Sequence, residues 1–160
     1  MKKIKFILLM SIILNSCQFP KTIDESSLKR IEEKPDNSEL YGTWELDSFS
    51  YDYVSKTYSN NNDFDIVLNI NQDNSFLLKN MPFYDNFGVQ KYTKLTTIDG
   101  NWILKQSFNK KYWELKLDYL IYEKTKSMIL MLFNKKDTGL VIWKFIGDPD
   151  MGKRLLFEKV

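Results

Sequence analysis

Residues 113–121, WELKLDYLI, decide how this chain folds. Trp113, Leu115, Leu117 and Tyr119 occupy every second position, and charged residues stand between them. Successive side chains of a strand point to opposite faces of a sheet, so this period of two gathers the apolar residues on one face. A helix would instead need apolar residues three or four positions apart. The stretch therefore predicts a half-buried β-strand.

The same period of two dominates the chain from Tyr41 onward, and short clusters of turn-forming residues interrupt it. Such a pattern is typical of antiparallel strands joined by hairpins. The predicted strands are 43–54, 64–71, 75–80, 89–105 with a break near Asp99 and Gly100, 112–122, 128–133, 140–146 and 154–158. Strands that are neighbours in the sequence pair most simply in up-and-down order, and closing the sheet removes its exposed edges. We expect an all-β fold, an eight-stranded antiparallel up-and-down barrel.

The first 17 residues, MKKIKFILLMSIILNSC, have the composition of a signal peptide. Three lysines precede the apolar run 6–14, which is too short to span a bilayer. The run leads to Leu-Asn-Ser-Cys, which ends at Cys17, the single cysteine of the chain. This tetrapeptide resembles the lipobox of bacterial lipoproteins, from which it departs at Asn15. The resemblance implies that residues 1–16 are a lipoprotein signal peptide, that Cys17 is lipidated with acyl chains such as palmitate, and that the protein is exported.

Lipidation of Cys17 would anchor the protein to the membrane, because two or three acyl chains hold essentially permanently. Gln18 follows the cysteine where some lipoproteins carry aspartate, which resembles the class sorted to the outer membrane of the cell envelope. Residues 17–39 are mostly polar and carry two prolines, so they are predicted to be the lipidated cysteine and a tether. Residues 40–160 are predicted to form the barrel domain.

Residue types that the chain lacks exclude several kinds of site. There is no histidine, and the only cysteine is assigned to lipid, so His and Cys metal sites, Ser-His-Asp or Cys-His catalysis and a disulfide are not expected. No spacing of the aspartates singles out an acid–base pair. The runs 60–63 and 147–152 carry carboxylates but too few ligands for Ca²⁺, and turns explain them better. We expect no enzyme activity, no metal and no cofactor.

The charge of the chain argues against a nucleic-acid partner. The net charge of +2 includes three lysines of the signal peptide; without them, 20 basic residues face 21 acidic ones. A nearly neutral chain gives no broad attraction toward phosphates. We expect a membrane partner through the N-terminal lipid and no nucleic acid.

Several short motifs of the strand region resemble a known family. They are Gly42-Thr43-Trp44 at the start of the first strand, Asp73-Asn74-Ser75-Phe76 at a hairpin and Gly100-Asn101-Trp102 in a middle strand. Together they are similar to the lipocalin-like small lipoproteins of bacteria. The resemblance implies a barrel with a central cavity, often for an apolar small molecule, and a floor closed by Trp44.

Aromatic side chains on the inward phases of the strands are the candidate ligand-binding residues. An eight-stranded barrel is just wide enough to be filled by such side chains or to hold one small ligand. We favour packing, because large rings consume the volume that a ligand needs. The candidates are Trp44, Phe64, Phe76, Trp102, Trp113, Tyr119 and Trp143.

Two surfaces offer an alternative to ligand binding. The strands 128–133 and 140–146 are apolar on both phases, so one face of this hairpin needs a cover. A segment around 27–34, a second copy of the chain or a membrane partner could supply it, and we favour the segment. Tyrosine-rich stretches at 51–58 and 81–92 could bind sugars or proteins. The alternative function is a structural or interaction module of the envelope, with a filled barrel and no ligand.

Overall fold

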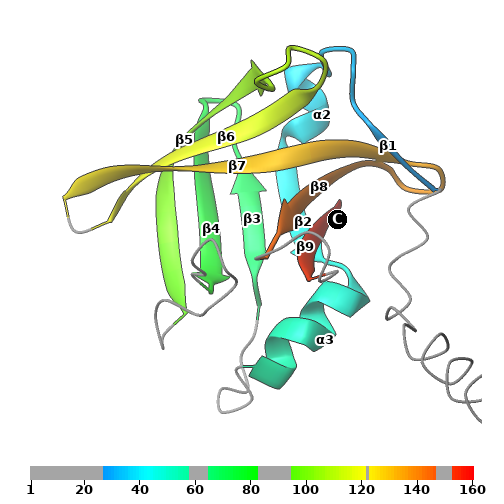
Figure 1. Cartoon of the computed structure of the whole chain (residues 1–160). Helices are drawn as coiled ribbons and strands as arrows, with labels where there is room; N and C mark the ends of the chain where they lie inside the picture. Colours follow the sequence, from blue (N-terminus) through cyan, green and yellow to red (C-terminus); the bar gives the residue numbers. More distant parts are fainter. Residues whose placement is uncertain (1–26, 58–64, 83–94, 122, 147–152) are drawn as a thin grey trace, which may run out of the picture.

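A computed structural model describes residues 27–57, 65–82, 95–121, 123–146 and 153–160 (Figure 1). These ranges contain nine strands and two helices. Their bounds are β1 Leu28–Arg30, α2 Asn37–Leu40, β2 Gly42–Leu46, α3 Ser48–Thr57, β3 Val67–Ile70, β4 Ser75–Met81, β5 Thr96–Gln106, β6 Trp113–Ile121, β7 Lys124–Lys135, β8 Gly139–Phe145 and β9 Arg154–Lys159.

Strands β2 to β9 form a closed barrel. Each strand pairs antiparallel with the next in the sequence, and β9 returns to β2 through the pair Trp44 and Lys159. The eight-stranded up-and-down barrel predicted from the sequence is therefore confirmed. Helix α2 lies at one end of the barrel and α3 at the other (Figure 1), and these are named the α2 end and the α3 end below.

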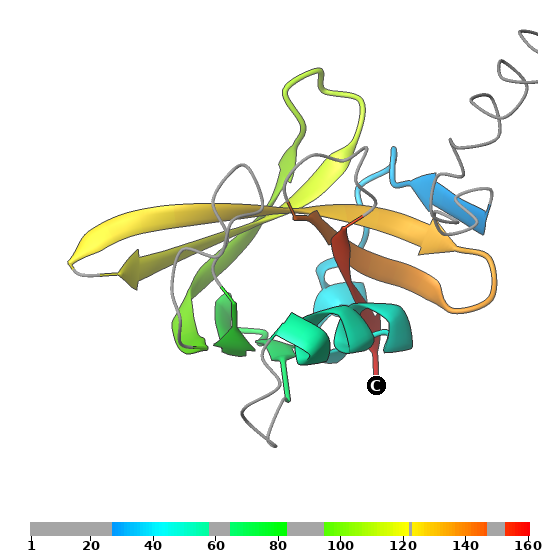
Figure 2. The same cartoon turned by 60° about the horizontal axis from the view of Figure 1, so that its bottom comes forward.

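Strand β7 joins two parts of the barrel wall. Its residues 124–131 pair with β6, whereas it pairs with β8 only over 131–135. Within the described ranges, the first half of β7 is therefore bonded on one edge alone. The β6–β7 hairpin projects away from the barrel in both cartoon views (Figures 1 and 2). The wall consequently parts between β7 and β8 at Met131 and Trp143, the last pair of their ladder.

A floor closes the α2 end of the barrel. Asp36 begins α2 with a capping box, in which Ser38 N donates to Asp36 Oδ1 and Asp36 N donates to Glu39 Oε2, both over 2.8 Å. The helix ends at buried Leu40, whose carbonyl accepts from Trp44 Nε1 at 2.8 Å. Trp44 therefore lies at the α2 end, where it is fully buried and bonded to the last residue of α2.

The second Gly-x-Trp motif braces the same floor. Trp102 Nε1 donates to Asn71 O at 3.0 Å, and its ring meets that of Tyr41 edge-on with centroids 6.0 Å apart. The predicted break at Asp99 and Gly100 is wrong, because β5 runs through both residues. Gly100 instead permits a close strand contact, since a Cβ at this position would lie 2.0 Å from the carbonyl oxygen of Asp118 on β6.

The prediction of a strand over 43–54 is wrong after Leu46. Helix α3 occupies 48–57, and it takes in most of the tyrosine-rich stretch predicted as a loop. Asp47 explains the start of the helix, because its Oδ1 accepts from Ser50 N at 2.9 Å and its carbonyl accepts from Tyr51 N at 2.9 Å. Val54 of α3 is buried in the barrel core, so tertiary packing stabilises the helix in addition to the capping by Asp47.

Part of the predicted tether belongs to the folded domain. Within 17–39, β1 pairs with the far end of β7, where Leu28 faces Lys135 and Arg30 faces Phe133. Leu28 also packs against the outer apolar cluster of Val141, Trp143 and Leu156. The segment favoured as a cover for the apolar hairpin thus adds a strand beside it. The predicted features at 60–63, 83–92 and 147–152 lie outside the described residues.

Stability is expected to fall as the pH drops below about 4, because exposed aspartates are better bonded in the folded chain. Hydrogen bonds from Ser75 hold the pKa of Asp73 below its ordinary value of 3.8, and bonds from Ser38 do the same for the pKa of Asp36. A carboxyl with a lowered pKa binds fewer protons in the folded state, so its contribution is present above the unfolded pKa and is lost in acid. Urea unfolding from pH 7 to pH 2 measures this loss. Asp73→Asn should flatten the curve, and an unchanged curve would contradict the assignment.

Candidate functional site

The candidate site is the inner face of the barrel wall at the α3 end, where β6, β7 and β8 part. Side chains on this face become more exposed toward the β6–β7 hairpin. On β6, Leu117 is fully buried and Tyr119 is 8% exposed; on β7, Leu130 is buried, Met128 is 7% exposed and Lys126 is exposed. The floor half of the barrel shows no such gradient, since Trp44, Phe76 and Trp102 have almost no exposed surface.

Lys144 lies on this inner face. Its neighbours by two positions, Ile142 and Ile146, belong to the barrel core, whereas Trp143 and Phe145 belong to the outer apolar cluster. Alternation along the strand therefore points Lys144 inward. It stands opposite Leu155 of β9, one residue beyond the last β7–β8 pair.

The environment of Lys144 disfavours its charge. Burial lowers the pKa of Lys144 below its ordinary value of 10.5. No carboxylate of the described residues forms an ion pair with it. The side chain is partly exposed, so the ammonium retains some contact with solvent. A mostly buried, unpaired amine at an opening in the wall is the chemically distinctive group of this site.

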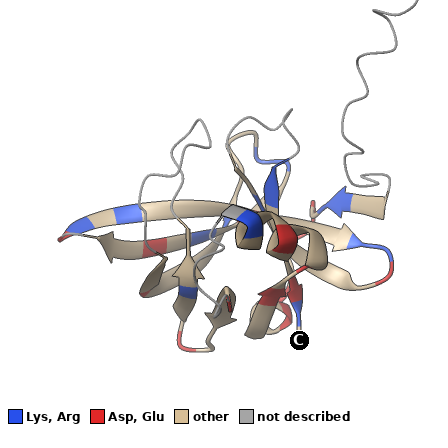
Figure 3. Ribbon diagram, turned by 90° about the horizontal axis from the view of Figure 1, so that it is seen from below, with Lys and Arg blue, Asp and Glu red and all other residues tan. Residues whose placement is uncertain are grey.

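Two further lysines share the inner face. Lys124 faces Ile121 across the ladder and Lys126 faces Tyr119, and cross-strand partners project on the same side of a sheet. Figure 3 shows lysine bands along the projecting part of β7. The nearest carboxylate of β6, Asp118, lies on the outer face, where Lys116 Nζ binds its Oδ2 at 2.7 Å and Ser127 donates to its Oδ1. Among the described residues, the charged side chains that β6, β7 and β8 place on this inner face are therefore positive.

The seven aromatic residues predicted to bind a ligand have different positions. Trp44, Phe76, Trp102 and Tyr119 lie in the barrel core. Trp113 is partly buried and packs against that core. The inward position predicted for Trp143 is wrong, because its strand turns Ile142 and Lys144 inward and leaves the indole in the outer cluster. Phe64 lies outside the described residues, and of the other six only Tyr119 reaches the candidate site.

Lys144 was missed by the sequence analysis. The run 140–146, LVIWKFI, is apolar on both phases apart from its single lysine, so its overall pattern does not draw attention to Lys144. The signal that could have found it is the alternation of Ile142, Lys144 and Ile146, which puts the amine on the same face as two isoleucines. The period alone does not say which of the two faces is inside.

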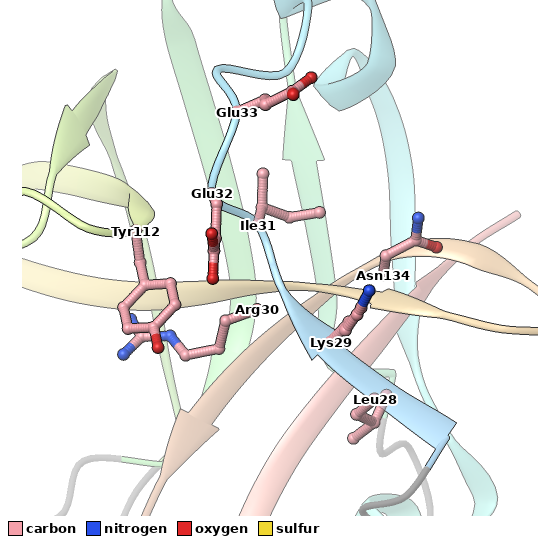
Figure 4. A pocket seen from close by; sticks show the side chains of 8 residues that line it. All are labelled: Leu28, Lys29, Arg30, Ile31, Glu32, Glu33, Tyr112 and Asn134. Atoms are coloured by element: carbon pink, nitrogen blue, oxygen red, sulfur yellow. The ribbon is translucent and has the colours of Figure 1, made fainter.

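A separate groove of about 570 Å³ runs beside β1 (Figure 4). The Arg30 guanidinium lies 4.2 Å from the ring centroid of Tyr112 and 3.2 Å from Glu114 Oε1, and Lys111 pairs with Glu32 over 3.7 Å. These side chains pair with one another across the junction of β1 with the start of β6, although Arg30 Nε is buried without a hydrogen-bond partner among the described residues. The groove is therefore interpreted as a structural seam. The residues that line it are Leu28, Lys29, Arg30, Ile31, Glu32, Glu33, Tyr112 and Asn134.

The outer face of the α3 end is fastened by a buried arginine. Arg154, 3% exposed, stacks between the rings of Phe49 on α3 and Trp143 on β8, each 4.8 Å from its guanidinium carbon. Its Nη1 donates to both carboxylate oxygens of Asp47, at 3.1 and 3.0 Å, and to Ser50 Oγ at 3.1 Å. These contacts hold α3 against β8 and β9.

No family model, no curated protein and no solved structure matches this chain. Over the ranges that the structure describes, three or more metal-ligating acidic or sulfur side chains do not gather at any point. None of the helices in these ranges has the length and hydrophobicity needed to cross a bilayer.

Proposed function

We propose that this protein is a lipid-anchored protein of the cell envelope that binds a small, largely apolar molecule at the α3 end of its barrel. The observation that carries the proposal is the rise in exposure along the inner faces of β6 and β7, from fully buried Leu117 to Tyr119 and from Leu130 to Met128 and Lys126. Tyr119 and Met128 are still largely buried, at 8% and 7% exposed, but they lie beside exposed Lys126 at the end of the wall. Apolar residues at the mouth of a barrel are typical of ligand sites.

The binding place would be shallow rather than deep. A space large enough for water would expose the side chains that line it, yet Trp44, Leu68 and Leu115 show no exposed surface. The floor half is therefore filled by protein, and a ligand would contact the inner face between β6 and β8. The ligand would therefore be the apolar small molecule expected from the sequence, bound at the barrel mouth and not in a central cavity.

A photoreactive probe tests the ligand site in the full-length protein. Membranes that contain the protein are irradiated with a long-chain alcohol that carries a diazirine, and the labelled peptides are identified by mass spectrometry. We expect labels within 117–130 and 142–146. Labels restricted to residues 1–26 or to outer-face side chains would contradict the proposal.

Two neighbouring substitutions supply a matched control. Met128→Trp adds bulk on the inner face and should lower labelling severalfold, whereas Ile129→Trp adds the same bulk on the outer face, since Ile129 is exposed and faces Lys116. Equal effects of both substitutions would show that the probe does not depend on the inner face.

Membrane attachment through Cys17 forms the other half of the proposal. Ten residues separate Cys17 from Leu28, so a lipid on Cys17 would hold β1 within about 40 Å of the bilayer, the reach of a fully extended chain of that length. The barrel would thus lie close to the bilayer, with β1 nearest to it. Cys17→Ser removes the thiol that accepts lipid, and we expect the protein to lose labelling by radioactive palmitate. Undiminished labelling would contradict lipidation at this residue.

A second candidate function is binding of another envelope protein through the outer face of β5, β6 and β7. Ile103, Lys116 and Ile129 form one row across these strands, and Leu120 nearby is 68% exposed. Exposed apolar side chains grouped around charges are common at interaction sites. Crosslinking in intact cells with a photoreactive amino acid at Leu120 should capture one discrete partner, whereas the same amino acid at Lys136 should not.

A further inference from the structure

We propose that the molecule bound at the α3 end carries an acidic group, and that Lys144 binds this group. The proposal rests on the function proposed above and specifies the chemical class of the ligand. It is an amphiphile with an apolar body and a carboxylate or similar anion at one end.

The first argument is the position of the amine. Lys144 projects between two core isoleucines, beside the point where the β7–β8 ladder ends. An ammonium that is largely removed from water, with no counter-ion among the described residues, is unfavourable, because the protein interior replaces its hydration poorly. A methionine or leucine would pack there without that penalty. An anion supplied from outside the chain would provide the missing partner.

The second argument is that the nearby carboxylates of the described chain are engaged elsewhere. Asp47 binds Arg154, Asp118 binds Lys116, and Glu158 binds Lys135. All three pairs lie on the outer face, because Arg154, Asp118 and Glu158 each stand next to a core residue of their strand, namely Leu155, Leu117 and Phe157. None can neutralise Lys144 without abandoning a closer cation.

The surroundings favour an amphiphile over a free inorganic anion. Ile142, Ile146, Leu130 and Leu155 are apolar and buried, so they offer no hydrogen bonds to the remaining oxygens of phosphate or sulfate. An apolar chain, in contrast, gains free energy where it covers the apolar side chains of this face that keep some exposed surface, Tyr119 and Met128. One ammonium at the edge of an apolar surface therefore matches a molecule that has one charged end.

Lys124 and Lys126 add positive charge near the opening between β7 and β8. Both are exposed on the inner face of the projecting hairpin, and neither forms an ion pair with a described carboxylate. Their charges raise the local concentration of anions near the opening, an effect that salt weakens. Lys144 is the residue that would contact the acid once it is bound.

The test compares two probes that differ only in their head group. Membranes containing the full-length protein are labelled in parallel with the diazirine alcohol and with the corresponding long-chain acid. A charge-assisted hydrogen bond predicts that inner-face labelling by the acid exceeds that by the alcohol by about tenfold at equal concentration. Lys144→Met should remove this preference, so that the acid and the alcohol label the inner face to the same extent.

Two further variants separate charge from packing. Lys144→Arg keeps the positive charge and should retain most of the preference for the acid. Lys136→Met removes an exposed lysine in the β7–β8 turn at the other end of the barrel and should change nothing. Equal labelling by the two probes, or a preference that survives Lys144→Met, would overturn the role of Lys144 alone. Absence of inner-face labelling by either probe would overturn the proposed function as well.

Discussion

Gly100→Ala is expected to lower the free energy of unfolding by about 3 kcal/mol or more, which could prevent folding altogether. The added Cβ would lie 2.0 Å from Asp118 O and 3.1 Å from Tyr119 Cα, both backbone atoms of the neighbouring strand. Backbone atoms cannot rotate away as the end of a side chain can. The pairing of β5 with β6 must therefore open to admit the methyl group. Urea unfolding followed by tryptophan fluorescence measures the loss.

Gly139→Ala is the matched control for this prediction. Gly139 has a φ of +79°, and no atom lies within 4 Å of a Cβ added there. Alanine at this position would therefore strain the backbone without causing a steric clash. A single residue in the left-handed region costs about 1 kcal/mol. If Gly100→Ala proved no more harmful than Gly139→Ala, the strand contact would not be as close as described.

Asp47→Ala is expected to destabilise the folded state by about 3–5 kcal/mol, because it leaves the buried guanidinium of Arg154 without its counter-ion. Asp47 also accepts from Ser50 N, so the substitution weakens the start of α3 together with its attachment. Thermal unfolding followed by far-UV circular dichroism gives the size of the loss.

A double substitution separates the ion pair from the helix cap. Arg154→Met removes the buried charge, so adding Asp47→Ala to it should cost only about 1 kcal/mol, the usual worth of an N-cap. Additive losses from the two single substitutions would mean that Asp47 and Arg154 do not stabilise each other. The prediction of their coupling would then be wrong.

The barrel could be predicted from the sequence because its strands are amphipathic and its hairpins are short. In WELKLDYLI, local alternation and tertiary burial agree, and β6 occupies 113–121 as expected. Around residues 48–54, local alternation and tertiary burial do not agree. Tyr51 and Tyr53 alternate as in a strand, but the capping bonds of Asp47 and the burial of Val54 make a helix more stable there.

The candidate site was harder to predict, because it depends on where a ladder ends. Alternation places Ile142 and Lys144 on one face, yet it does not state that β7 leaves β8 at Met131. The partial exposure of the inner face arises from that parting. Likewise, β1 is only three residues long, and its place beside β7 follows from tertiary pairing rather than from any local period.

The pairing of the first and last barrel strands makes closure of the barrel a late step in folding. Trp44 of the first barrel strand pairs with Lys159 of the last, so the barrel cannot close until residue 159 is available. A contact this distant in the sequence forms slowly compared with the hairpins between them. If the protein reaches the envelope as proposed, its N-terminal part would cross the membrane before Trp44 and Lys159 could pair. The unclosed polypeptide could then pass through a channel that admits unfolded chains, and the barrel would close on the far side of the membrane.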